Sequence, residues 1–294
     1  MKGWNTLYTT KHIGYLGPEG TFSEQAAMEV FGDCDSFSYH RYPTIQECLL
    51  AANKQLLDYA LVPVENSIGG SVNITVSQLV HDLHIPIQGE VHLPISYELL
   101  GSDPEVCIDS CEIIYGHPQA LRQCDDYLRR HYNDVVLQPT DSSSAAAKMV
   151  AENPDQAALA LANTATRHIY GLTVIASEIE NNAENTTRFI VLGDDAIDLS
   201  RDIIKSTLII TLPGHDLRVL QNVLGTFETL ALKPLKIESV PLKKKLGEYA
   251  YIIDVDTTSH HDSYLQACDA IQKWGCSLRH LGTYGVCHHR GCDE

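Results

Sequence analysis

The sequence predicts an α/β protein built from two units, and two observations carry this interpretation. From residue 11 to about residue 195, short apolar runs alternate with amphipathic stretches, as helices packed on a sheet require. The chain has 294 residues, which is long for one typical domain, and 44% of them are hydrophobic against 20% charged. We therefore expect a folded chain with a second, smaller unit after residue 195.

Short apolar runs predict the strands of the first unit. They are residues 13–16, 59–63, 113–115, 157–161 and 188–192. The first three runs end where a motif of small and polar residues begins. Ligands of open α/β sheets bind beyond the carboxyl ends of the strands, so we expect these motifs to meet in one crevice.

Capping residues mark where helices begin. Thr21 and Glu24 have the spacing of a capping box, and residues 141–150 place Asp and Ser before a helix-forming run. The acidic stretch 193–202 interrupts the pattern and predicts a linker at the domain boundary.

The pattern after the linker predicts a βαββαβ unit. Its expected elements are a strand at 206–212, a helix at 217–230, strands at 235–242 and 249–255, a helix at 264–274 and a strand at 277–284.

Charge and composition exclude several classes of partner. The net charge of −17 would repel nucleic acid and anionic membranes, so an anionic substrate needs local compensation. The N-terminus has no apolar signal region and no stretch is long enough to span a membrane, so we expect a cytoplasmic protein. The nine cysteines lie in apolar contexts and predict buried thiols without disulfides.

Four motifs together resemble those of prephenate dehydratases, and the resemblance covers nearly the whole chain. They are GYLGPEGTFS at 14–23, PVENSIGGS at 63–71, GHPQALRQC at 116–124 and NTTRF at 185–189. The resemblance implies a reaction in which prephenate loses carbon dioxide and its ring hydroxyl to give phenylpyruvate, on the route to phenylalanine. No cofactor is needed, because formation of the aromatic ring supplies the driving force. Neither nucleotide-binding glycine motif is present, so we expect no nucleotide.

The resemblance also implies an architecture. The catalytic domain, residues 11–195, would have two lobes like type II periplasmic binding proteins, one formed by about 11–93 with 175–195 and the other by about 94–174. The lobes would close on the substrate and expel water. Residues 203–286 would form a regulatory ACT domain. By analogy with other such domains, we expect a homodimer or homotetramer.

The resemblance assigns the catalytic role to Thr187, whose hydroxyl would donate a hydrogen bond to the departing hydroxyl. The alternative is that Thr187 only caps a turn or pairs within the sheet. The matching family positions make Thr186, Arg188 and Phe189 substrate contacts. Neighbouring residues of a regular strand point to opposite faces, so Thr187 and Arg188 cannot both face the cleft. The alternative role for Arg188 is an ion pair, for example with Glu65.

Other expected substrate contacts come from the remaining motifs. Asn66 and Gln123 match family positions that contact substrate, while the alternatives are a turn residue and a surface glutamine. The backbone N–H groups of the turn that follows Asn66 could hold a carboxylate, and Thr21 lies where a helix N-terminus favours an anion. The residues expected in that turn are Ser67, Gly69, Gly70 and Ser71.

Gly116 stands where the family usually has serine, which removes one substrate-contacting hydroxyl. This departure leaves open an arogenate dehydratase, whose substrate carries an amine in place of the keto group. A non-catalytic metabolite-sensing module is a third possibility, because a two-lobed binder joined to an ACT domain could report a metabolite without chemistry.

The resemblance implies that phenylalanine is the effector, bound near Gly214, Leu217, Glu238 and Ser239. Val240 replaces an arginine of the family motif, and His215-Asp216 replaces an apolar pair. We therefore expect the fold to be retained with weakened or altered effector specificity. The sequence CHHRGC at 287–292 allows a four-ligand zinc site, but a frayed polar tail is the simpler interpretation and we predict no metal.

Overall fold

The computed structural model describes residues 10–103, 111–199 and 202–288, and it contains two sheets. The first has ten strands in the order β13-β14-β12-β15-β5-β11-β3-β1-β2, with β4 paired to β3. Its strands are β1 (Lys11–Leu16), β2 (Phe37–Tyr42), β3 (Tyr59–Asn66), β4 (Gly70–Ser71), β5 (Ile87–Pro94), β11 (Thr186–Gly193), β12 (Ile204–Thr211), β13 (Lys233–Pro241), β14 (Tyr249–Asp256) and β15 (Ser277–His288).

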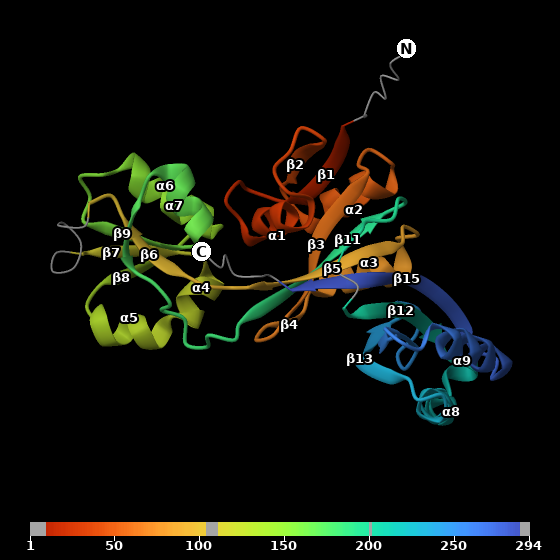
Figure 1. The fold of residues 1–294 in the computed structure, drawn as a ribbon. Coiled ribbons are helices and arrows are strands. Elements are labelled where there is room, and N and C mark those ends of the chain that lie inside the picture. The colour runs from red at the N-terminus through yellow and green to blue at the C-terminus, as the bar shows by residue number, and fades with distance from the viewer. Residues whose placement is uncertain (1–9, 104–110, 200–201, 289–294) are drawn as a thin grey trace, which may run out of the picture.

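The second sheet has five strands in the order β10-β6-β9-β7-β8 and forms a separate lobe (Figure 1). Its strands are β6 (Glu98–Gly101), β7 (Ile113–Gly116), β8 (Val136–Pro139), β9 (Ala158–Ala162) and β10 (Thr173–Ala176). Because β10 belongs to this sheet, the second lobe extends to Ala176; the boundary that we expect lies at about residue 175.

Helices cover both sheets. They are α1 (Phe22–Phe31), α2 (Ile45–Asn53), α3 (Asn73–His81), α4 (Pro118–Gln123), α5 (Asp125–His131), α6 (Ser143–Glu152), α7 (Thr164–Tyr170), α8 (Leu217–Thr229) and α9 (His261–Lys273), with a 3₁₀ turn η1 (Pro213–His215). Thr21 caps α1 as expected, because its Oγ1 accepts a hydrogen bond from Glu24 N at 3.3 Å, whereas the Glu24 side chain accepts from Gly20 N and not from Thr21 N. Among the described residues, no helix is long and apolar enough to cross a bilayer.

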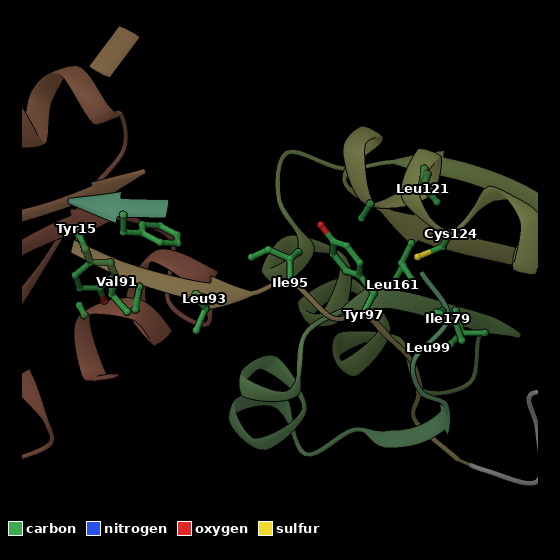
Figure 2. Packing of buried hydrophobic residues seen from close by; sticks show 14 of the residues in the cluster. Tyr15, Val91, Leu93, Ile95, Tyr97, Leu99, Leu121, Cys124, Leu161 and Ile179 are labelled. Carbon is green, nitrogen blue, oxygen red and sulfur yellow. The ribbon is translucent and has the colours of Figure 1, made fainter. Parts of the chain in front are cut away.

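Two neighbouring segments join the lobes: the chain that leaves β5 and the chain that enters β11. Ile95 N donates to Asn185 O at 2.8 Å where they run side by side. A buried apolar row, including Val91, Leu93, Ile95 and Tyr97, runs along the first segment from one lobe core into the other (Figure 2). The crossing is therefore well packed as well as hydrogen-bonded.

The C-terminal elements β12-α8-β13-β14-α9-β15 follow the predicted βαββαβ order. Their strands continue the sheet of the first lobe, because β15 runs on to pair in parallel with β5 from Gly285 to His288. Gly282 allows this approach: it has φ +155°, and a Cβ there would lie 2.2 Å from Ile87 O. Cys287 and His288 thus end a strand, whereas we expected a frayed tail from residue 287 onward. The rest of that motif lies outside the described residues.

Candidate active site

A cavity of about 550 Å³ lies beside the segment that enters β11. Its lining residues come from the turn between β3 and β4, from α4 and from the chain before β11: Ile68, Gly69, Gln119, Arg122, Gln123, Glu180, Asn181, Asn182 and Asn185. Most of these side chains carry amides, and Arg122 is the cation among them. Gly69 and Gln123 are the expected site residues that line this cavity.

Thr187 is joined to the cavity wall through Asn66. Asn66 Nδ2 donates to Asn185 Oδ1 at 2.8 Å and to Thr187 Oγ1 at 3.0 Å, and it approaches Thr186 O at 3.3 Å. Asn66 is 9% exposed, and neither it nor Thr187 lines the cavity directly. The expected pair of Asn66 and Thr187 is therefore in contact, next to the cavity.

Three N–H groups of the turn after Asn66 are occupied within the chain. Ile68 N and Gly69 N donate to Asn66 Oδ1 at 3.1 and 2.8 Å, and Ser67 N donates to Thr186 O at 2.8 Å. For Ser67, Ile68 and Gly69 the expected carboxylate-binding turn is thus corrected: these N–H groups hold the Asn66 side chain and the entry to β11.

Gln123 has its side chain buried at 8% exposure, with neither amide atom hydrogen-bonded among the described residues. Asn185 is 0% exposed, and its Nδ2 likewise has no partner in the described part of the chain. Buried polar groups are almost always hydrogen-bonded, so two unpartnered amides in one cavity wall indicate a ligand site. We had not assigned Asn185 a role, although an asparagine before a strand, beside a motif residue, was a usable signal.

Arg188 is corrected from a substrate contact to an ion-pair residue. Its guanidinium points to the opposite face of the sheet from Thr187, as strand alternation predicts, and binds Glu65 at 2.5 Å, Glu90 at 2.8 Å and Asp254 at 2.7 Å. The ion pair with Glu65, the alternative role, is present. Asp254 lies on β14, so the cluster joins the first lobe to the C-terminal unit.

Two carboxylates of this cluster, Glu90 and Glu65, stay charged despite burial. Glu90 is 0% exposed, which by itself would raise its pKa, but the hydrogen bond from His92 and the charges of Arg188 and Lys205 hold the pKa well below its ordinary value. Burial also opposes ionisation of Glu65, yet Arg188 and nearby Lys236 lower its pKa.

The remaining expected substrate contacts point elsewhere. Ser71 Oγ donates to Glu238 Oε2 at 2.7 Å, toward the C-terminal unit, and Thr186 Oγ1 bonds to Glu184 O at 3.3 Å. Phe189 is 2% exposed within the core. Gly70 pairs with Asn66 at the start of β4.

The loop before α1 meets the second lobe. Thr21 Oγ1 donates to Leu16 O at 2.9 Å and so shapes this loop. Asn163 Nδ2 donates to Gly20 O at 2.9 Å, and Ser144 Oγ donates to Glu19 O at 2.5 Å. The two lobes are therefore in contact here as well as at the crossing segments.

Gly116 ends β7, and a Cβ at this position would meet Leu121 Cδ2 at 3.0 Å. The space that a serine side chain would enter is therefore partly filled by Leu121. A serine here requires that leucine to move by a few tenths of an ångström.

The expected effector residues come from separate places in the C-terminal unit. Gly214 lies in η1 and Leu217 begins α8, where it is 65% exposed. Glu238 and Ser239 lie on β13, which β14 separates from β12. Val240 is 6% exposed and packs in a core cluster with Ile252. Among the described residues, no group of three or more His, Cys, Asp and Glu could hold a metal ion.

Two α/β lobes, joined by paired crossing segments beside a polar cavity, define a protein of the class that binds a small molecule between its lobes. The comparisons give the family: the chain belongs to the prephenate dehydratases, whose family model matches residues 13–197.

Relatives and solved structures agree with this family. The chain is 38% identical to the prephenate dehydratase of Lactococcus lactis subsp. cremoris strain MG1363, over 93% of this chain and 97% of that protein. It is 32% identical to arogenate dehydratase/prephenate dehydratase 2, chloroplastic, of Arabidopsis thaliana, over 93% of this chain and 72% of that protein. A structure of the Arthrobacter aurescens prephenate dehydratase in complex with L-Phe matches with TM-score 0.82 and 27% identity, over 93% of this chain and 89% of that one. Such structures have a periplasmic-binding-protein-like fold.

Proposed function

We propose that this chain converts prephenate to phenylpyruvate by loss of carbon dioxide and the ring hydroxyl. The observation that carries this proposal is the hydrogen bond from Asn66 Nδ2 to Thr187 Oγ1 at 3.0 Å. Since Nδ2 can only donate, Thr187 accepts, and the hydroxyl proton of Thr187 has no acceptor among the described residues. Thr187 is therefore held as a donor for an oxygen of the substrate.

The reaction suits such a donor. As the bond from the ring to the leaving carboxylate breaks, its electron pair enters the ring, and the hydroxyl leaves from the opposite ring carbon. The departing oxygen gains negative charge, which the Thr187 hydroxyl stabilises by a hydrogen bond, while solvent supplies the proton that completes the water molecule. One preorganised donor of this kind contributes about 3–4 kcal/mol to a transition state.

The cavity wall suits a dianionic substrate in a chain of net charge −17. Amide side chains donate hydrogen bonds to carboxylates without adding a buried charge, and Arg122 adds one cation, which offsets the carboxylate of Glu180 in the same wall. Movement of the lobes about the crossing segments would bring the cavity wall and Thr187 around one substrate.

The test is phenylpyruvate formation by the purified chain given prephenate, without added metal. Turnover supports the proposal. Absence of turnover, in a folded preparation, would favour a metabolite-sensing module that binds without chemistry.

Arogenate dehydration is the second candidate, favoured by the missing hydroxyl at Gly116. A parallel reaction with arogenate, scored for phenylalanine, separates the two activities. Higher kcat/KM on arogenate would move the assignment to that substrate.

We also propose that residues 203–286 form an ACT domain that binds phenylalanine in a cytoplasmic homodimer or homotetramer. The βαββαβ order and the L-Phe complex of the Arthrobacter relative support this. Gly214, Leu217, Glu238 and Ser239 would line the effector site, with affinity weakened by Val240 and by Asp216. Calorimetric titration with phenylalanine tests effector binding, and light scattering tests the oligomeric state. Tight binding of phenylalanine would contradict a weakened effector site.

A further inference from the structure

The orientation of the Asn66 amide is fixed by the backbone. Its Oδ1 accepts hydrogen bonds from Ile68 N at 3.1 Å and from Gly69 N at 2.8 Å. A backbone N–H can only donate, so the atom facing both of them must be the oxygen. The amide nitrogen of Asn66 must therefore point the other way.

This orientation passes to two further side chains. Asn66 Nδ2 lies 2.8 Å from the side chain of Asn185 and 3.0 Å from Thr187 Oγ1. Because Nδ2 can only donate, Asn185 has to present its Oδ1, and Thr187 has to accept. Two donors remain beyond this network: the Nδ2 of Asn185 and the hydroxyl proton of Thr187.

The backbone of Asn185 is hydrogen-bonded, but among the described residues the Nδ2 of its side chain is not. Its backbone oxygen accepts from Ile95 N at 2.8 Å, and its backbone nitrogen donates to Asn182 O at 3.2 Å. Its side chain is 0% exposed and lines the cavity, yet Nδ2 has no partner in the described part of the chain. A buried donor without an acceptor is costly, and a ligand oxygen would remove that cost.

We infer that Asn185 is a further substrate-binding residue, whose Nδ2 donates a hydrogen bond to a carboxylate of the substrate in a direction set by Asn66. This inference rests on the proposed function. Asn66 thereby prepares two donors at once, one for binding through Asn185 and one for the departing hydroxyl through Thr187. A carboxylate is the fitting acceptor because the substrate carries two of them and a neutral amide adds no competing charge.

The test is the isosteric substitution Asn185→Asp in the full chain. It keeps an oxygen to accept from Asn66 but replaces the outward donor with a second oxygen. The substitution is made in a Thr187→Ala background, in which turnover is slowed so that calorimetry measures prephenate binding. We expect the Kd to rise about ten- to a hundredfold, as loss of a hydrogen bond to a charged group implies.

Asn133→Asp in the same background is the matched control. It makes the same charge change in an exposed loop of the second lobe, and the Kd should stay within about twofold, as for surface changes elsewhere. If the Kd of the Asn185→Asp variant equals the Kd of the Asn133→Asp control, the inference is overturned. A wild type that turns over neither prephenate nor arogenate would instead overturn the proposed function, so the two failures are distinguishable.

A measurement that does not depend on folding of the Asn185 variant is the ¹⁵N spectrum of side-chain amides in Thr187→Ala. Prephenate should shift the Nδ2 proton signals of Asn185 downfield. Saturation with prephenate while those signals stay in place would also overturn the inference.

Discussion

At the scale of single residues, strand alternation separates two functions that stand next to each other in sequence. Thr187 meets Asn66 on one face of β11, while Arg188 meets three carboxylates on the other. The alternation itself was predictable from sequence. The occupation of the Ile68 and Gly69 amides by Asn66 was not, because a side chain turning back on its own loop leaves no periodic signal.

The role of Thr187 predicts a sharp difference between two substitutions. Thr187→Ala removes the donor, and we expect kcat to fall about 100- to 1000-fold with little change in stability. Thr187→Ser keeps a hydroxyl that can accept from Asn66, so it should retain most of the activity. Steady-state kinetics with prephenate measures both, and an alanine variant as active as the serine variant would refute a donor role.

Because the Asn66 amide has one fixed orientation, we expect that replacing it with aspartate, which has the same shape, also impairs catalysis. In Asn66→Asp an oxygen replaces Nδ2, so the Thr187 hydroxyl turns to donate to it and is lost to the substrate. We expect kcat to fall about 100-fold or more, with the melting temperature measured alongside. Activity near the wild-type value would show that the Thr187 proton is not directed by Asn66.

At the scale of elements, the long apolar runs were predictable and the polar strands were not. β3 and β11 are buried and match expected runs, whereas β2 and β5 were missing from the expected set. β5 carries Gln88, Glu90 and His92 at alternate positions, which argues against a strand buried on both faces in the centre of a sheet. The partners that allow Glu90 to be buried, Arg188 and Lys205, lie about 100 residues away in sequence.

The join between β15 and β5 predicts a large cost for Gly282→Ala. The new Cβ would approach Ile87 O to 2.2 Å, and the residue has φ +155°, so the strands must separate. We expect a loss of about 2–3 kcal/mol in the free energy of unfolding, measured with urea. Gly225→Ala is the control, because a Cβ there meets nothing within 4 Å in α8 and should stabilise by about 0.5–1 kcal/mol. Equal stabilities of the two variants would show that the close approach is absent in solution.

At the scale of the whole molecule, one buried ionic cluster connects the C-terminal unit to the back of the candidate site. Arg188 follows Thr187, Glu65 precedes Asn66, and both belong to a cluster that includes Asp254 of β14. Lys236 of β13 adds a contact to Glu65 at 3.2 Å. A shift of the C-terminal strands would therefore be transmitted to β3 and β11, which carry Asn66 and Thr187.

Glu90 lies at the centre of this cluster, and its removal should be costly. Glu90→Gln leaves Arg188 and Lys205 buried without that counter-charge, and breaking a buried pair typically costs about 3–5 kcal/mol. Exposed Glu228 on α8 is the control, since Glu228→Gln should change stability by less than about 0.5 kcal/mol. Urea denaturation at pH 7 measures both.

The loss of unfolding free energy in Glu90→Gln should depend on pH in a characteristic way. The pKa of Glu90 is lower in the folded chain than its ordinary value of about 4.3, so the unfolded state binds the proton more readily. Its stabilising contribution is therefore complete above that ordinary value and is lost as the pH falls below it toward the folded pKa. The difference in unfolding free energy between wild type and Glu90→Gln should stay constant from pH 7 to about 5.5 and shrink between about pH 4.5 and 3. A difference that persists unchanged to pH 3 would mean that packing, and not the charge of Glu90, holds the C-terminal unit against the site.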